Sequence, residues 1–256
     1  DRRYVAHNDA ANLRPKGKAT PAQARRRPFA TAQLRTIFAA PIYTGCVDDE
    51  RNYAKSGPNH PRRSRFWVPL IGLFTGLRME EIFQLTPAHV QTGRDDLPFL
   101  LISPDMQVKT DNAFREVPVH RELLRIGFMA FVADRRRSGE NFALFDDVPA
   151  ATDGYRSTNF SKRFATFLKS LGIKDDPRRT CFHSFRHNFR DGLRQPGANG
   201  DFVREAGGWA TRETSEFYGD GTRAHLLRGL IDGIDYDLDL RHLYQTGMFE
   251  ELQAGD

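Results

Sequence analysis

The stretch that decides the fold of this chain reads Cys181-Phe182-His183-Ser184-Phe185-Arg186-His187. If residues 182–193 form a helix, its two histidines and its arginine occupy positions i, i+3 and i+4 and share one face. A guanidinium fork on that face suits the two non-bridging oxygens of a phosphodiester. Downstream, Tyr218 offers a phenol that attacks where neighbouring charges or a base favour its ionised form. The segment therefore predicts a phosphate site near a tyrosine nucleophile.

Paired histidines also raise the possibility of a metal site. His183 and His187 have no glutamate between them and no partnered pair of cysteines nearby. That pattern does not favour zinc. We expect neither a metal nor another cofactor.

An upstream segment adds a second cation. It reads Phe74-Thr75-Gly76-Leu77-Arg78-Met79-Glu80-Glu81-Ile82, in which a turn containing glycine precedes an amphipathic stretch. Arg78 and Glu81 stand three residues apart, close enough for the carboxylate to orient the guanidinium.

A third segment predicts a hairpin. Residues 108–119 indicate two short strands around the turn Asp111-Asn112, and Lys109 would lie on that hairpin.

Together and in this order, the motifs resemble the catalytic domain of the tyrosine recombinases, the phage-type integrase family of DNA strand-exchange enzymes. The resemblance runs from about Phe66 to Tyr218. It is carried by Thr75-Gly76-Leu77-Arg78 with Glu81, by Lys109, by His183-Ser184-Phe185-Arg186-His187, by Gly207-Gly208-Trp209 and by Tyr218. Each motif alone is an ordinary pattern, in which the same residues serve as solvated or core side chains. Their joint order is specific.

The resemblance implies a role for each site residue. Tyr218 would attack the scissile phosphate and form a 3′-phosphotyrosyl bond, and Arg78 and Arg186 would hold the non-bridging oxygens. Lys109 would protonate the departing 5′ oxygen, and His183 would accept the tyrosine proton. Glu81 and His187 would brace the site.

Trp209 departs from the histidine that is commonest in the family at this position. An indole can donate a hydrogen bond to the phosphate or buttress Tyr218, but it cannot exchange a proton. The acid and base work then falls on Lys109 and His183.

The charge balance fits a polyanionic partner. The chain has 38 Lys and Arg against 33 Asp and Glu, a net charge of +5. Basic runs occur at residues 25–27, 62–65, 135–137 and 178–179. The runs that flank the motifs are preferred as DNA phosphate contacts, with Arg62, Arg63, Arg178 and Arg179 as the candidates.

Length and composition bound the architecture. The 256 residues could form one large domain or two small ones. Its apolar runs fall short of the ~20 residues of a membrane span. Two cysteines, Cys46 and Cys181, are too few for a disulfide framework and indicate a reducing cytosolic setting.

Local patterns predict a mainly α fold with one small antiparallel sheet, an α+β class. Residue 31 is the expected N-cap of the first helix, and strands are expected at 99–102 and in the hairpin arms. Helices are predicted at residues 31–40, 65–75, 79–85, 121–137, 157–171, 182–193, 200–206, 211–218, 224–234 and 241–252.

These patterns and the resemblance suggest a division of the chain. Residues 1–28 have the composition of a linker or arm, and 29–256 would form the catalytic domain with a helical tail at 224–256. The chain begins at Asp1, so we expect an excerpt without the N-terminal DNA-binding domain of the family.

The resemblance also implies partners. They are a double-stranded DNA recombination site and a homotetramer formed on it, in which the tail could pass to a neighbouring protomer or dock on its own core. The setting would be the cytoplasm, with a bacterial or phage-encoded protein associated with the nucleoid and a mobile genetic element.

Two other functions stay open at this level. One is DNA relaxation of the type IB topoisomerase kind, which uses similar chemistry without strand exchange. The other is a DNA-binding module without catalysis, against which the filled catalytic positions argue.

Overall fold

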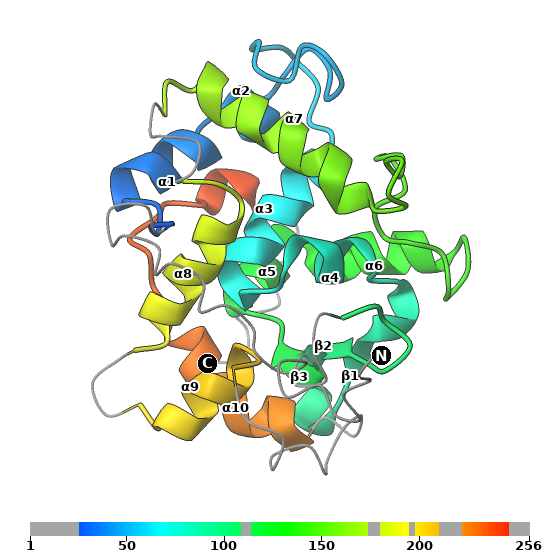
Figure 1. Cartoon of the computed structure of the whole chain (residues 1–256), viewed down its shortest axis with the longest axis vertical. Coiled ribbons are helices and arrows are strands. Elements are labelled where there is room, and N and C mark those ends of the chain that lie inside the picture. The colour runs from blue at the N-terminus through cyan, green and yellow to red at the C-terminus, as the bar shows by residue number, and fades with distance from the viewer. Residues whose placement is uncertain (1–25, 109–113, 174–179, 195–197, 210–221, 246–256) are drawn as a thin grey trace, which may run out of the picture.

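The computed structural model describes residues 26–108, 114–173, 180–194, 198–209 and 222–245. Its fold is mainly α with a small antiparallel sheet, as the sequence predicts (Figure 1). The elements in chain order are α1 Thr31–Phe38, α2 Pro41–Thr44, α3 Ser64–Thr75, α4 Met79–Phe83, β1 Val90–Thr92, β2 Pro98–Ile102, β3 Arg115–Pro118, α5 Arg121–Ile126, α6 Phe128–Arg136, α7 Arg156–Ser170, α8 His183–Gly192, α9 Gly200–Ala206 and α10 Thr222–Asp232. Short 3-10 turns occur at Pro87–His89, Arg94–Asp96 and Arg241–Leu243.

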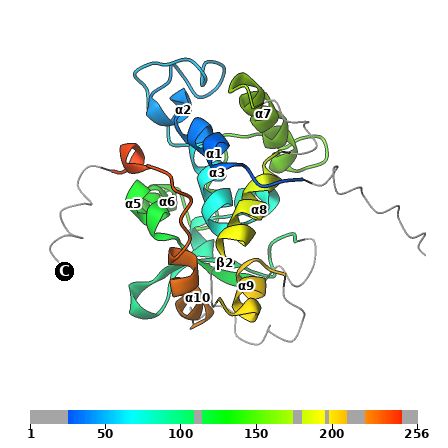
Figure 2. The same ribbon diagram turned by 90° about the vertical axis from the view of Figure 1, so that its left-hand side faces the viewer.

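Helix α3 is the centre of the molecule, with every residue from Ser64 to Thr75 other than Arg65 buried. A helix that is apolar on all sides must be covered on all sides, and Figures 1 and 2 show α8 running alongside it. Two glycines on α3 allow the close approach of α8. A Cβ at Gly72 would come within 2.7 Å of the Phe182 ring, and one at Gly76 within 2.2 Å of the Phe189 ring. The packing therefore joins the two predicted motifs directly.

The sheet has the order β1-β2-β3, and its two faces have different partners. On one face, Leu100 and Ile102 of β2 belong to the main core together with Val117 of β3. On the other face, Phe99 packs against Ala224 at the start of α10. Figure 2 shows α9 and α10 beneath the sheet. The thin sheet thus separates the main core from the C-terminal helices.

Strand β3 is the second arm of the predicted hairpin. It pairs with β2, where Ile102 lies opposite Arg115 and Leu101 opposite Glu116. The sequence did not predict β1, a three-residue strand too short to carry an alternating pattern. Residues 109–113, with the predicted turn and Lys109, lie outside the described residues.

The single helix predicted at 121–137 is wrong. Gly127 has φ +96°, a left-handed conformation, and divides the segment into α5 and α6. The apolar residues keep a near-helical spacing on both sides of Gly127, so their pattern does not reveal that the helix ends there. Thr31 is also not the N-cap of α1. The N-cap is Ala30, whose backbone N–H donates to the side-chain oxygen of Gln33 at 3.0 Å.

Part of the apolar stripe of α10 packs on its own chain, whereas Leu226 keeps 47% of its surface exposed. Leu227, Ile231 and Ile234 form a cluster with Phe189 of α8 and Ala206 of α9. The chain then returns across the main core, where Leu240 and Leu243 are buried. Of the predicted helix at 241–252, the structure describes a 3-10 turn at Arg241–Leu243, and residues 246–256 lie outside the described part. Within the described ranges, no helix is long and apolar enough to cross a bilayer.

Candidate active site

Arg78 is set by the turn that ends α3. Gly76 caps the helix with φ +62°, and its N–H bonds to the Gly72 carbonyl at 3.2 Å. This left-handed cap turns the chain back, buries Leu77 and makes Arg78 the N-cap of α4. The Arg78 side chain keeps 28% of its surface exposed, so it can still meet a ligand.

Glu81 holds two arginines at once. It accepts from the Arg78 backbone N–H at 2.9 Å and from Arg78 Nη1 at 2.5 Å. Its other partner is Arg115 of β3, whose Nη2 lies 3.0 Å from Glu81 Oε2. Burial alone would raise the pKa of Glu81, but Arg115 and Arg78 outweigh it and lower the pKa to about 2. Glu81 is therefore an ionised carboxylate that holds both arginines.

Arg186 joins the two ends of the site. Its guanidinium donates to the carbonyls of Gly76 and Gly207, so it bridges the turn after α3 and the turn after α9. Its Cζ lies 4.8 Å from the centre of the Trp209 ring, a cation–π contact. The structure thus brings Arg78, Arg186 and Trp209 to one place.

Positive charge gathers at this point. Among the described residues, Arg78 and Arg115 both pair with the Glu81 carboxylate, and the charges of Arg78, Arg115 and Glu81 act on Arg186. Burial and the two neighbouring guanidinium groups lower the pKa of Arg186 to about 9, which still leaves it charged at neutral pH. This gathering of guanidinium groups favours an anionic ligand.

The surroundings of His183 disfavour its charged form. Its pKa is lowered to about 4 by burial and by the positive charge of His187, Arg186, Arg26 and Arg78. The imidazole is therefore neutral at pH 7 and has a free lone pair. The rings of His183 and His187 meet edge to face with centroids 5.1 Å apart, so His187 supports its neighbour.

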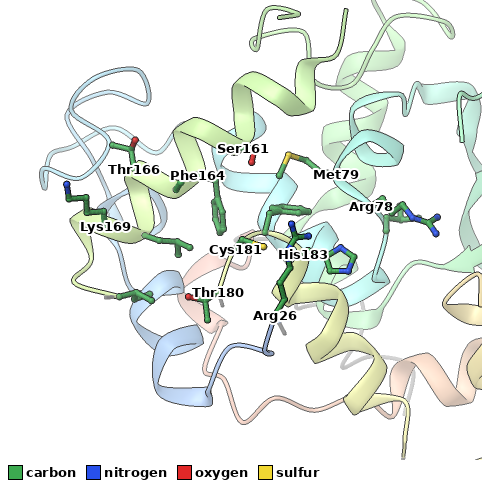
Figure 3. Close-up of a pocket in the computed structure, with 15 residues that line it drawn as sticks. Arg26, Arg78, Met79, Ser161, Phe164, Thr166, Lys169, Thr180, Cys181 and His183 are labelled. Atoms are coloured by element: carbon green, nitrogen blue, oxygen red, sulfur yellow. The ribbon is translucent and has the colours of Figure 1, made fainter. Parts of the chain in front are cut away.

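A cavity of about 720 Å³ opens beside these residues, between α7 and the start of α8 (Figure 3). Phe164, Phe182 and other apolar side chains form much of its wall. Its basic lining residues are Arg26, Arg78, Lys169 and His183, and none of the described lining residues is Asp or Glu. The cavity thus extends the positive region away from Arg78.

The segment that carries Arg26 is held near this region by hydrogen bonds to a residue far away in the sequence. Asn188 of α8 accepts from the Phe29 N–H at 2.9 Å and donates to the Phe29 carbonyl at 2.8 Å. The Phe29 ring packs on Phe185 with centroids 4.9 Å apart. In Figure 3 Arg26 reaches from the segment before α1 toward His183.

Two arginines of the site, Arg26 and Arg115, were not predicted there from the sequence. A basic run at 25–27 was visible, but nothing local linked it to the site. Only one feature of the sequence pointed to Arg115: it is a charged residue in an expected strand, close to Val117, which is buried.

Arg62 and Arg63 do not suit their predicted role as phosphate contacts. Arg62 donates to the carbonyls of Ile126 and Leu243 at 2.5 and 2.6 Å, and Arg63 pairs with Asp49. Both precede α3, whereas Arg78 follows it, and a helix of 12 residues is about 18 Å long. Their guanidinium groups brace the loop before α3.

Four predicted residues, Lys109, Arg178, Arg179 and Tyr218, lie outside the described residues. The chain before Lys109 is nevertheless fixed near the site. Gln84 accepts from the Gln107 N–H at 2.7 Å and donates to its carbonyl at 3.0 Å. Val108 and Arg78 line the same small cavity.

The described residues contain no group of three or more His, Cys, Asp or Glu side chains that could hold a metal ion. The site is instead built from guanidinium, imidazole and indole groups.

The chain is similar to a known protein family and to solved structures. Residues 56–225 match the model of the phage integrase family, which confirms the predicted resemblance. No curated protein matches the chain in sequence. Among solved structures, the integrase from mycobacterium phage Brujita is 18% identical over 91% of this chain and 66% of that chain, with a TM-score of 0.48. The Tn1549 transposon integrase, in complex with circular intermediate DNA, is 18% identical over 95% of this chain and 67% of its own, with a TM-score of 0.46. The chain spans about two thirds of the length of these two solved chains.

Proposed function

The chain belongs to the phage integrase family, and on that premise we propose that it is a site-specific DNA recombinase that cleaves and rejoins DNA strands through a 3′-phosphotyrosyl intermediate. The observation that carries the proposal is the cluster of Arg78, Arg115 and Arg186 around Glu81. This cluster of guanidinium groups suits a phosphodiester, whose negative charge grows toward the transition state.

In the proposed cleavage step, the Tyr218 oxygen bonds to the scissile phosphorus while the bond from phosphorus to the 5′ oxygen breaks. His183 takes the phenol proton, because its lowered pKa keeps its imidazole neutral. Lys109 gives a proton to the departing 5′ oxygen. Each proton has a donor and an acceptor, so the step leaves a free 5′ hydroxyl and a phosphotyrosine.

Arg78 and Arg186 would stabilise the pentacoordinate phosphate. Arg186 uses two of its donors on the carbonyls of Gly76 and Gly207 and has others left for the phosphate oxygens. Trp209 would supply an indole N–H. Rejoining reverses the step with a 5′ hydroxyl of the partner strand, and since the phosphotyrosyl ester conserves the bond energy, it needs no cofactor.

The DNA strand would continue from Arg78 along the cavity between α7 and α8. Arg26 and Lys169 line that cavity without an acidic neighbour in its described lining, so they are the proposed contacts for flanking phosphates. Arg178 and Arg179 stay proposed contacts, since they follow the cavity residue Ile173 and precede Thr180.

The proposed partner is a double-stranded recombination site bound by four copies of the chain, on a mobile genetic element in the bacterial cytoplasm and nucleoid. Since residues 222–245 pack on their own chain, we propose exchange of a tail between protomers only for residues after Gln245.

The test is a suicide substrate made from the ends of the element that encodes the protein, with a nick that traps cleavage. Wild type in EDTA should form a covalent adduct on a denaturing gel, and Tyr218→Phe should form none. Binding of this DNA without an adduct would overturn the catalytic proposal in favour of a DNA-binding module. Relaxation of supercoiled DNA without a specific site would instead favour a topoisomerase.

A further inference from the structure

Strand β3 carries two buried charges that point to opposite faces of the sheet. Side chains of successive strand residues alternate between faces. Arg115 lies on the main-core face and reaches Glu81, which orients Arg78. Glu116 lies on the other face, toward α10. Both are almost fully buried, Arg115 with 2% and Glu116 with 1% of its surface exposed.

Glu116 bonds to the start of α10. Its Oε2 accepts from the Ala224 backbone N–H at 3.0 Å. Ala224 is fully buried and packs against Leu97 and Phe99. A carboxylate at this end also meets the positive pole of the helix, and the N–H would otherwise lack a partner within the helix.

A second contact supports the same turn of α10. Arg223 Nε lies 2.7 Å from Glu205 of α9, and both side chains are largely buried. The first turn of α10 is therefore tied to β3 by Glu116 and to α9 by Glu205.

We propose that Glu116 is a positioning residue for the nucleophile. It fixes the first turn of α10, four residues after Tyr218, to the strand whose opposite face holds Glu81 and Arg78. The inference rests on the proposed function, since it requires Tyr218 to attack a phosphate held by Arg78 and Arg186. Glu116 acts through Ala224 and does not itself touch the DNA.

The length of chain explains why this anchor matters. Four residues span at most about 14 Å, whereas the nine residues from Trp209 to Tyr218 span up to about 32 Å. The C-terminal anchor is thus the tighter limit on where Tyr218 can reach. A misplacement of about 1 Å can slow a reaction about 100-fold.

Loss of the Glu116 contact should loosen the first turn without undocking α10. The later turns are held by Leu227, Ile231 and Ile234, which pack against α8 and α9. We therefore expect an effect on the rate of attack that exceeds the effect on folding or on DNA binding.

Two variants separate reach from charge. Glu116→Asp keeps the charge but shortens the side chain by one methylene, and Glu116→Gln keeps the reach and an acceptor oxygen. Asp232→Asn is the matched control. Asp232 pairs with Arg228 and accepts from the Arg121 N–H at the other end of α10, far from Tyr218 in the chain.

The experiment measures three quantities for each protein: the single-turnover rate of adduct formation at saturating suicide DNA, the DNA Kd and the melting temperature. We expect Glu116→Asp to slow adduct formation about 10- to 100-fold with a Kd within about 2-fold of wild type. Glu116→Gln should stay within about 3-fold in rate, and Asp232→Asn should keep the wild-type rate even where it melts lower.

If wild type is active and Glu116→Asp forms the adduct at the same rate, this inference is overturned and the proposed function stays intact. The inference would also be overturned if Asp232→Asn lost as much rate as Glu116→Asp, or if weaker DNA binding explained the rate loss of Glu116→Asp. An inactive wild type that binds the DNA would instead overturn the proposed function.

Discussion

Phe189 of α8 lies directly over Gly76, so that a Cβ added to Gly76 would come within 2.2 Å of Phe189 Cδ1. Gly76 is also the residue whose carbonyl accepts from Arg186 and whose turn leads into Arg78. One backbone position therefore sets the helix packing and the separation of the two arginines.

Substitution of Gly76 should damage both stability and activity. Gly76→Ala adds a methyl group against Phe189 at a residue with φ +62°. Strain and overpacking together should lower the free energy of unfolding by about 2–4 kcal/mol, measured by urea denaturation. The cleavage rate should fall even where the protein remains folded.

The matched control is Gly229→Ala in α10, where an added Cβ meets no atom within 4 Å. This variant should be unchanged or more stable by up to about 1 kcal/mol. Equal losses in both variants would contradict the role given to Gly76.

The pKa of Glu81 predicts how stability depends on pH. The folded pKa is about 2 and the usual value is 4.5, so the stability contributed by the ionised carboxylate is present above about pH 4.5 and is lost as pH falls toward 2. The shift corresponds to about 3 kcal/mol. Glu81→Gln should lose this part of the acid dependence and be destabilised at pH 7, because half-buried Arg78 and buried Arg115 lose the charge of their shared carboxylate partner.

Urea denaturation of both proteins between pH 3 and 7 measures this effect. A Glu81→Gln protein with an acid dependence as steep as that of wild type would show that other groups cause it.

The cluster of Arg78, Arg115 and Arg186 predicts binding of small anions. Inorganic sulfate or phosphate should raise the melting temperature of wild type as its concentration rises, since a ligand that binds only the folded state stabilises it. Chloride at equal ionic strength is the control for screening. Arg186→Ala should lose most of the sulfate-specific increase, and an increase that persists undiminished in this variant would place the anion elsewhere.

His183 should titrate at higher pH when DNA is bound. Burial and nearby positive charges lower its pKa to about 4 in the free protein. A phosphate beside the ring favours the imidazolium, so the pKa should rise. Histidine NMR titration of the Tyr218→Phe protein with and without its DNA measures the change. An unchanged midpoint, with DNA demonstrably bound, would separate His183 from the scissile phosphate.

Arg26 should contribute to DNA binding through a phosphate. Arg26→Ala should weaken binding about 3- to 10-fold and reduce the slope of log K against log salt by about 1. Arg137→Ala is the control, because Arg137 is exposed and pairs with Asp134 at the end of α6. Equal losses in the two variants would indicate general electrostatic attraction and not a contact at the cavity.

Local spacing was enough to predict the parts of the site that lie within one helix or turn. Arg78 and Glu81 are three residues apart, and the histidines of α8 share its first turn with Arg186, so the helical repeat alone brings them together.

Contacts made across the fold could not be predicted this way. Arg115 meets Glu81 across 34 residues, and Asn188 brings Arg26 to the site through a clamp on a residue 159 positions away. Arg62 shows the opposite error. It stands near a motif in the sequence, but it lies before α3 while Arg78 lies after it, and two of its guanidinium nitrogens donate to backbone carbonyls.

The alternating charges of β3 also protect its register. A slip of one residue against β2 would turn every side chain to the other face. Glu116 would then face Glu81, a carboxylate against a carboxylate, and Arg115 would face the positive pole of α10. The misaligned sheet would therefore be penalised on both faces at once, whereas an apolar pair at these positions would tolerate either alignment. Two adjacent ionised residues thus act as a check on the folding of the sheet, independent of any reaction with DNA.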